Sequence, residues 1–136
     1  MQDKYRRTAT TVSMIRYHFV FCPYRRRKIF DIPGVEQRFK ELVPEVCDRY
    51  GYEILALECH HDHVHLFISA SPADTPSIIM HQIKGITSKT IRTEFSTLSK
   101  APSLWTRSFF VSTAGDVSAA VIKKYIDSQK VNKCTP

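Results

Sequence analysis

Residues 52–70, YEILALECHHDHVHLFISA, contain two short apolar runs joined by a polar turn, and this pattern decides the fold. Both runs, 52–60 and 63–70, are short, mostly apolar and partly alternating, which predicts a strand in each. Only His61 and Asp62 separate the two runs, so the strands must lie antiparallel as a hairpin.

Two further segments resemble strands. The run 11–21, TVSMIRYHFVF, and the run 105–113, WTRSFFVST, are rich in β-branched and aromatic residues. A basic loop, CPYRRRK, follows the first of them. The sequence thus predicts one strand before the hairpin and one after it.

The segments between these strands have the apolar spacing of helices. Apolar residues recur at helical spacing over 33–50, and Gly51 suits the end of such a helix. Pro44 lies inside that span, so we expect it to kink or interrupt the helix. A second helix is predicted over 75–95, with Thr75 as its N-cap and apolar positions facing inward. Lys84, Lys89 and Arg92 are expected on its solvent-exposed side.

A last helix is predicted from residue 117 to about 131, after Gly115 and a capping Asp116. The order of elements is then β-α-β-β-α-β plus a terminal helix. That order is typical of an α+β, ferredoxin-like or RRM-like split βαβ fold, with helices packed on an antiparallel four-stranded sheet. We expect a single domain over 1–136, with 1–10 as a flexible basic arm.

The charge balance points to an anionic partner. The chain has 20 Lys+Arg against 13 Asp+Glu, a net charge of +7, and such an excess favours nucleic acid. No apolar run approaches the ~20 residues that span a bilayer, and no signal peptide is visible. We therefore expect a cytoplasmic protein without a membrane partner. None of the four cysteines forms a C-x-x-C pair, which argues against a zinc knuckle.

Histidines gather at the hairpin. Side chains two apart on a strand share a face, so His63 and His65 project side by side, ~7 Å apart along the strand. Two imidazoles at that spacing can hold one divalent ion, although a bare pair is more typical of half-buried sheet histidines, so a third ligand is needed. Asp62 either orients one of them or is a turn residue. His60 and His61 are interpreted as turn or surface groups, with spare ligands as the alternative.

A second set of candidate residues lies near the C-terminus. Tyr125 and Gln129 are four residues apart, so they share a face of the predicted last helix. If that helix packs beside the second strand of the hairpin, Gln129 can supply an oxygen ligand and Tyr125 a phenol at the histidine face. The alternative is that Tyr125 packs beside Val121.

Several motifs together resemble a known family. HHDHVHLF, WTRSFFVSTAG and KKYIDSQ are similar to motifs of the HUH single-tyrosine transposases of the IS200/IS605 insertion sequences. RYHFVFCPYRRRKIF resembles the first strand and basic loop of that family, and QIKGITSKTIR resembles its second helix. The match spans nearly the whole chain in order. One departure is Pro23 before Tyr24, where many relatives carry Lys, which leaves the exact DNA contacts of that loop open.

The resemblance implies a mechanism and partners. Tyr125 would attack single-stranded DNA as the catalytic nucleophile and form a 5′-phosphotyrosine, while His63, His65 and Gln129 would hold Mg²⁺ or Mn²⁺. The DNA would be hairpins at transposon ends, and the enzyme would be a homodimer in a prokaryotic cell, associated with the nucleoid. Basic side chains are the candidate DNA contacts: Arg25, Arg26, Arg27, Lys28, Lys84, Lys89, Arg92 and Arg107.

Three alternatives remain from the sequence. The first is another HUH endonuclease, of the REP-associated, replication or relaxase type. The second is a non-catalytic RRM-like nucleic-acid binder, which would expose Tyr17, Phe19 and Phe67 on its central strands. The third is a metal phosphoesterase that activates water, which would need more carboxylate ligands. Trp105 and Phe109 could stack on bases, but core packing is their expected role.

Overall fold

A computed structural model describes residues 5–113 of the chain. Its main sheet has four strands in the order β4-β5-β3-β6, and every neighbouring pair is antiparallel. The strands are β3 (Ile15–Phe21), β4 (Glu53–Cys59), β5 (Val64–Ala70) and β6 (Phe110–Thr113). This order is that of the split βαβ arrangement, so the predicted fold class is confirmed. The predicted C-terminal helix falls outside the described residues.

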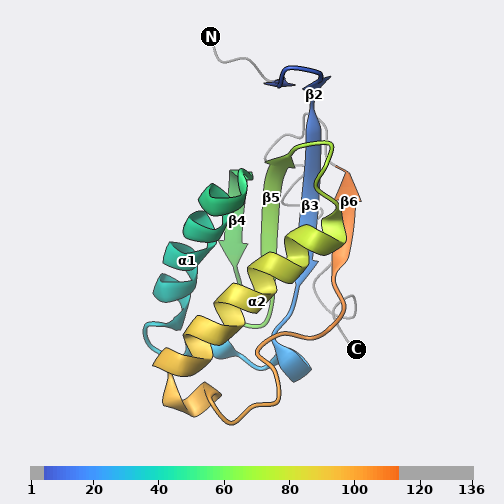
Figure 1. Cartoon of the computed structure of the whole chain (residues 1–136). Helices are drawn as coiled ribbons and strands as arrows, with labels where there is room; N and C mark the ends of the chain where they lie inside the picture. The colour runs from blue at the N-terminus through green and yellow to red at the C-terminus, as the bar shows by residue number, and fades with distance from the viewer. Residues whose placement is uncertain (1–4, 114–136) are drawn as a thin grey trace.

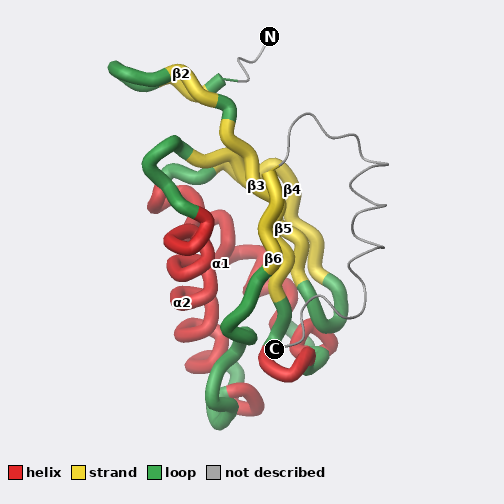
Figure 2. The backbone as a smooth tube through the Cα atoms, turned by 90° about the vertical axis from the view of Figure 1, so that its right-hand side faces the viewer, coloured by secondary structure: helices red, strands yellow, loops and turns green. Residues whose placement is uncertain are grey.

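Two long helices cover one face of this sheet. They are α1 (Val35–Tyr50) and α2 (Pro76–Glu94), and they lie together on the same side of the strands (Figures 1 and 2). The core fills the space between them and the inward side chains of the strands, including Phe19, Phe21 and Leu66. No helix among residues 5–113 is long and apolar enough to cross a membrane.

Strand alternation gives the sheet two distinct faces. Along β5, Val64, Leu66 and Ile68 join the core under the helices, so His65 and Phe67 point to the opposite face. The register pairs His65 with Val20 of β3. The face away from the two helices therefore carries His65, with His63 two residues before it.

Helix α1 begins at Val35, two residues later than predicted, and runs unbroken through Pro44. The expected interruption is wrong. Pro44 is exposed, so the carbonyl four residues earlier, which loses its intrahelical partner, can be hydrated by water. The helix ends as predicted, because Gly51 adopts φ 80° and its N–H donates to the carbonyl oxygen of Cys47.

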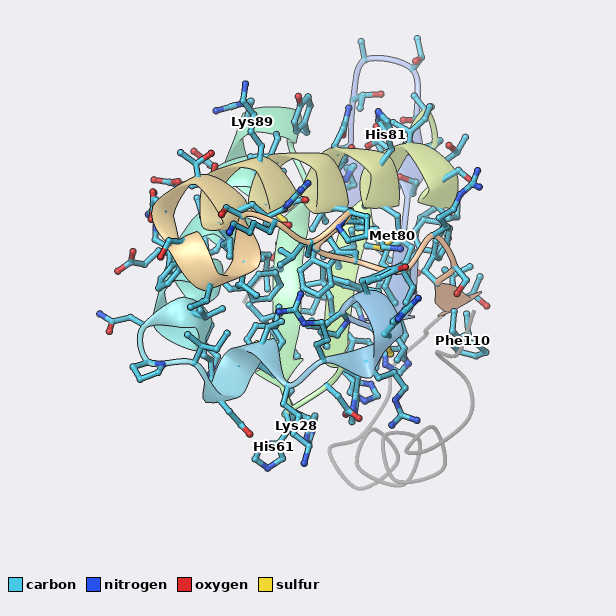
Figure 3. The ribbon with its side chains drawn as sticks, turned by 90° about the horizontal axis from the view of Figure 1, so that it is seen from below. Lys28, His61, Met80, His81, Lys89 and Phe110 are labelled. Carbon is cyan, nitrogen blue, oxygen red and sulfur yellow. The ribbon has the colours of Figure 1, made fainter. Side chains whose placement is uncertain are left out.

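Helix α2 starts as the sequence predicts. The Thr75 hydroxyl accepts a hydrogen bond from the Ile78 N–H at 3.2 Å, and Pro76 occupies the first turn. Figure 3 shows Met80 pointing from this helix toward the sheet, whereas His81 and Lys89 point away from it. Ile79, Ile83 and Ile91 are buried, as their spacing predicted.

The N-terminal strand differs from its prediction. It divides into β2 (Val12–Ser13) and β3, and β2 pairs with β1 (Arg6–Arg7) in a separate small hairpin. Within the segment expected to be a flexible arm, residues 6–7 thus form a short strand. The Arg6 guanidinium donates to the carbonyl oxygen of Ser69 at 3.2 Å, which ties this hairpin to the end of β5.

The connections contain three short 3₁₀ helices. They are η1 (Tyr24–Arg26), η2 (Ile29–Asp31) and η3 (Ser96–Leu98). The last predicted strand is shorter than 105–113, because regular pairing is confined to β6 and Trp105 makes one isolated bridge to Pro23.

Trp105 links the loop after α2 to the core. Its ring lies 4.9 Å from the Phe21 ring and 5.5 Å from the Phe39 ring, measured between centroids. Its Nε1–H donates to the Thr87 hydroxyl at 3.0 Å. The indole is 3 % exposed, so it packs in the core and cannot stack on a base.

Changing Trp105 to phenylalanine should lower the free energy of unfolding by about 1–3 kcal/mol, because the buried hydrogen bond to Thr87 is lost while an aromatic ring remains. Urea unfolding followed by circular dichroism measures the change, since the chain has a single Trp and fluorescence would lose its probe. Thr87→Val is the matched variant, and the double variant should cost less than the two single changes added together. Simple additivity would show that the hydrogen bond contributes nothing.

Candidate metal centre

The turn of the β4–β5 hairpin brings three histidines together. The His60 N–H donates to the His63 carbonyl oxygen at 2.9 Å, which closes the turn. The His60 and His63 rings stack at 4.5 Å and 9°, and the His65 ring lies 5.1 Å from that of His63. One ring nitrogen from each of the three lies within 4.8 Å of the others.

Each of these three side chains has a buried nitrogen without a hydrogen-bond partner among residues 5–113. The Nε2 atoms of His60, His63 and His65 have almost no solvent-accessible surface and no hydrogen-bond partner within the described part of the chain. A buried polar atom without a partner is costly. One cation bound between the three rings would satisfy all of them, so the arrangement fits a divalent metal ion.

Neighbouring groups determine which nitrogen can bind metal. The Nδ1 of His63 lies 2.9 Å from the Asp62 Oδ1, and the Nδ1 of His65 lies 3.0 Å from the Nε2 of His18. A carboxylate accepts, so His63 carries its proton on Nδ1 and leaves its Nε2 lone pair free. If the Nδ1–H of His65 donates to His18, its Nε2 is free in the same way. Such support of the ring nitrogen that does not bind metal is usual at metal sites.

The environment of the cluster lowers the pKa values of His18, His63 and His65. Burial lowers the pKa of His65 to about 3, with smaller contributions from the nearby histidines, and it lowers the pKa of His18 to about 4. Burial also lowers the pKa of His63, although the hydrogen bond to Asp62 opposes it. A neutral imidazole is the form that binds metal, so these rings need not lose a proton first.

Asp62 connects this cluster to the basic loop. Its Oδ2 accepts from the Arg26 Nη2 at 2.8 Å. Burial alone would raise the pKa of Asp62, but the hydrogen bond to His63 and the charge of Arg26 outweigh it and lower that pKa. Arg25 and Arg26 hold φ values of 55° and 54°, a left-handed backbone that is rare for these residues. The loop accepts this strain where it delivers Arg26 to Asp62.

The predicted DNA contacts divide into two groups. The exposed ones are available to a polyanion: Arg25, Arg27, Lys28, Lys89 and Arg107. In Figure 3, Lys28 and His61 both lie on the side of the molecule opposite α2. Arg26 is engaged by Asp62, so it is not a free surface charge.

Two residues of α2, Lys84 and Arg92, do not lie on its solvent-exposed side as predicted. Lys84 is half-buried, and its Nζ donates to the carbonyl oxygens of Thr106 and Ser108, each at 2.8 Å. Burial lowers the pKa of Lys84 to about 8. Arg92 is also half-buried and donates to the carbonyl oxygen of Ala101. The loop after α2 folds back and captures both side chains, which the helical period could not indicate.

A shallow groove of about 410 Å³ lies between α2 and the segment 103–109. Lys84, Arg107 and Phe109 are among the residues that line it. The Lys84 Nζ lies 5.5 Å from the Phe109 ring centroid. This basic groove does not include the three hairpin histidines.

The strands described here expose no aromatic platform of the RRM type. Phe19 is fully buried, and Tyr17 packs against the same core. Phe67 is 5 % exposed and stacks on the His18 ring at 4.0 Å. The features that the RNA-binding alternative needed are therefore missing from β3 and β5.

The structure brings together part of the predicted site. His63, His65 and Asp62 lie in one cluster, whereas Tyr125 and Gln129 fall outside the described residues. Sequence reasoning missed His18, whose contact with His65 depends on strand register. It also assigned His60 to the turn surface, although a two-residue turn is a signal that His60 and His63 are close.

The geometry defines a candidate divalent-metal site on the sheet face of an α+β domain, bordered by a basic loop. A family model described as "Transposase IS200 like" matches residues 11–129. The chain therefore belongs to the IS200-like transposases, the single-tyrosine enzymes of the IS200/IS605 type, and acts on DNA.

Two curated relatives agree with this assignment. The ISDra2 transposase TnpA of Deinococcus radiodurans is 26 % identical over 121 residues, which cover 87 % of this chain and 86 % of the relative. The transposase for insertion sequence element IS200 of Salmonella typhimurium is 30 % identical over 118 residues, which cover 84 % and 76 %.

Solved structures share the fold. A structure described as a transposase from Deinococcus radiodurans R1 superimposes with a TM-score of 0.76 at 24 % identity, covering 91 % of this chain and 97 % of that one. A REP-associated tyrosine transposase bound to a REP hairpin superimposes with a TM-score of 0.58 at 18 % identity, covering 95 % and 74 %.

Proposed function

We propose that this transposase cuts and rejoins single-stranded DNA, with Tyr125 as nucleophile and a divalent cation, Mg²⁺ or Mn²⁺, held at His63, His65 and Gln129. The observation that supports it best is that three histidines meet at the hairpin turn and that each has a buried Nε2 without a hydrogen-bond partner among the described residues. Isolated buried imidazoles would have hydrogen-bond partners. A set that leaves its lone pairs unpaired and close together is suited to a cation.

The reaction would have two steps, cleavage and rejoining. A phenol with a pKa of about 10 is a weak nucleophile at neutral pH. When bound, a divalent cation would polarise the scissile phosphate and stabilise the charge that develops on it. The Tyr125 oxygen would form a bond to phosphorus while the bond to the 3′ oxygen breaks, which leaves a 5′-phosphotyrosine and a 3′-hydroxyl. Attack by a 3′-hydroxyl on that ester would rejoin DNA and release Tyr125.

The substrate part of the proposal rests on charge and on one relative. The exposed arginines and lysines near the hairpin turn would contact the DNA backbone, which positions a strand without reading its sequence. The REP-associated relative is bound to a hairpin, which supports folded single strands as substrates here. Two ends must be held together in transposition, so we propose a homodimer that works on the nucleoid of a prokaryotic cell, with 1–136 as one domain.

A denaturing gel with labelled DNA tests this function. Single-stranded oligonucleotides from the flanks of the gene would be incubated with the protein and Mn²⁺, with EDTA as one control and the same sequence as a duplex as another. We expect a protein–DNA adduct that requires Mn²⁺ and a single strand. Cleavage without an adduct would instead support the water-activating phosphoesterase. An adduct formed only with a REP-type hairpin would favour the REP-associated alternative.

Asp62 offers a test of the metal site that does not depend on DNA. Changing Asp62 to asparagine should weaken Mn²⁺ binding about 10–100-fold, because the carboxylate no longer fixes the proton of His63 on Nδ1. Isothermal titration calorimetry measures the affinity. Asp31→Asn is the matched control, since Asp31 contacts the exposed His61 and not the cluster. Equal affinities for the two variants would remove Asp62 from the site.

A further inference from the structure

We infer that His60 is a third imidazole ligand, so that residues 60–65 form a three-histidine site that prefers Mn²⁺, Co²⁺ or Zn²⁺ to Mg²⁺. This inference rests on the proposed metal-dependent function and deepens it. It assigns a metal class to the site and adds a ligand that the His63–His65–Gln129 set does not contain. The consequence is a site that holds metal through the hairpin alone.

The backbone of the turn gives His60 its position. The hydrogen bond between the His60 N–H and the His63 carbonyl oxygen, at 2.9 Å, places the two residues opposite each other. Their rings are nearly parallel, at 9°, and the His65 ring meets the His60 ring at 82° and 5.7 Å. The His60 and His63 rings are therefore stacked, the His65 ring stands across them, and one ligand nitrogen from each lies within 4.8 Å of the other two.

The His60 ring is oriented for binding. Its side chain is 39 % exposed, yet its Nε2 is buried and has no hydrogen-bond partner in the described residues. An exposed histidine could easily turn that nitrogen to water, so its inward orientation needs a reason. Glu58 Oε2 lies 3.8 Å from this Nε2, too far for a hydrogen bond, and its charge favours a cation nearby.

The spacing is suitable for a metal after a small adjustment. The three ligand atoms lie within 4.8 Å of one another. Two nitrogens bound to one tetrahedral ion at ~2.05 Å are about 3.4 Å apart. His65 is 1 % exposed and held by His18, whereas the partly exposed His60 has room to move the remaining distance.

The donor set decides the metal class. Mg²⁺ requires oxygen ligands in octahedral geometry and retains its waters. Imidazole nitrogens suit the first-row transition metals and zinc. Three imidazoles against the single oxygen donor of Gln129 should therefore discriminate strongly against Mg²⁺, and the hairpin histidines should bind metal before Gln129 contributes.

The test is metal binding by the full-length protein without DNA. Co²⁺ titration followed by visible absorption reports nitrogen coordination, and calorimetry compares Zn²⁺, Mn²⁺ and Mg²⁺. We expect one ion per chain, with Zn²⁺ bound at least 100-fold more tightly than Mg²⁺. His60→Ala and His60→Gln should each weaken Zn²⁺ and Co²⁺ binding at least about 10-fold, which is the smallest loss expected when even a supporting residue is removed.

Two control variants make the result specific. His61→Ala removes the neighbouring histidine, which is 74 % exposed and contacts Asp31, and it should leave binding unchanged. Gln129→Ala should reduce Zn²⁺ affinity less than His60→Ala does. Wild-type affinity in both His60 variants would overturn the inference and leave the proposed function intact. No metal binding by the wild-type protein would overturn both, and an adduct assay in EDTA would then show whether tyrosine chemistry survives.

Discussion

Replacing Tyr125 by phenylalanine is expected to abolish the covalent protein–DNA adduct and to reduce cleavage by at least about 10⁴-fold, the scale seen when a catalytic nucleophile is removed. The substitution deletes one oxygen and keeps the ring. Folding, metal binding and DNA binding should therefore be unchanged. The measurement is single-turnover cleavage of labelled single-stranded DNA on denaturing gels.

Its control is another tyrosine of the same chain. Tyr5→Phe changes an exposed residue, 50 % accessible, far in sequence from the proposed nucleophile, and it should leave adduct formation at the wild-type level. Cleavage that persists in Tyr125→Phe at a similar rate would identify water as the nucleophile. An adduct that persists would mean that a different side chain attacks the phosphate.

Replacing His65 by alanine is the second change with a large expected effect. His65 is buried, and its Nδ1 is engaged by His18, so its ring is held in one orientation with Nε2 toward the cluster. We expect Mn²⁺ binding to fall below detection and cleavage to drop about 10³-fold, since a metal contributes several kcal/mol to stabilising the transition state. Calorimetry and the cleavage assay measure the two effects separately.

His81→Ala is the matched control for His65→Ala. His81 points away from the sheet on the outer side of α2 (Figure 3) and is exposed, so its loss should change neither measurement. Urea unfolding must accompany His65→Ala, because removing a buried ring also leaves a cavity. If the variant is folded and cleaves DNA at the wild-type rate, the histidine cluster is not the catalytic centre.

Much of the fold could be predicted because local patterns and tertiary structure agree. The alternation in 63–70 assigns Leu66 to the core and His65 to the other face, and the structure has that arrangement. The Thr75 cap and the Gly51 end also follow from local backbone chemistry. These features depend on neighbours in sequence, so a single chain shows them.

The errors occur where the outcome depends on distant segments. Pro44 leaves α1 continuous because its side of the helix faces water. Lys84 and Arg92 leave the wet side of α2 because the loop 96–106 supplies carbonyl groups to both. Helical periodicity predicts which face of a helix a residue occupies, but it does not predict which segment will pack against that face.

The sequence by itself determined the order of the elements, the pairing of His63 with His65 on one face, and the resemblance to the IS200/IS605 transposases. Tertiary structure alone decided that His18 supports His65 from a neighbouring strand, that Arg26 reaches Asp62, and that His60 turns its Nε2 inward. The physical reason is that side-chain periodicity is local, whereas strand register and loop closure are properties of the packed chain.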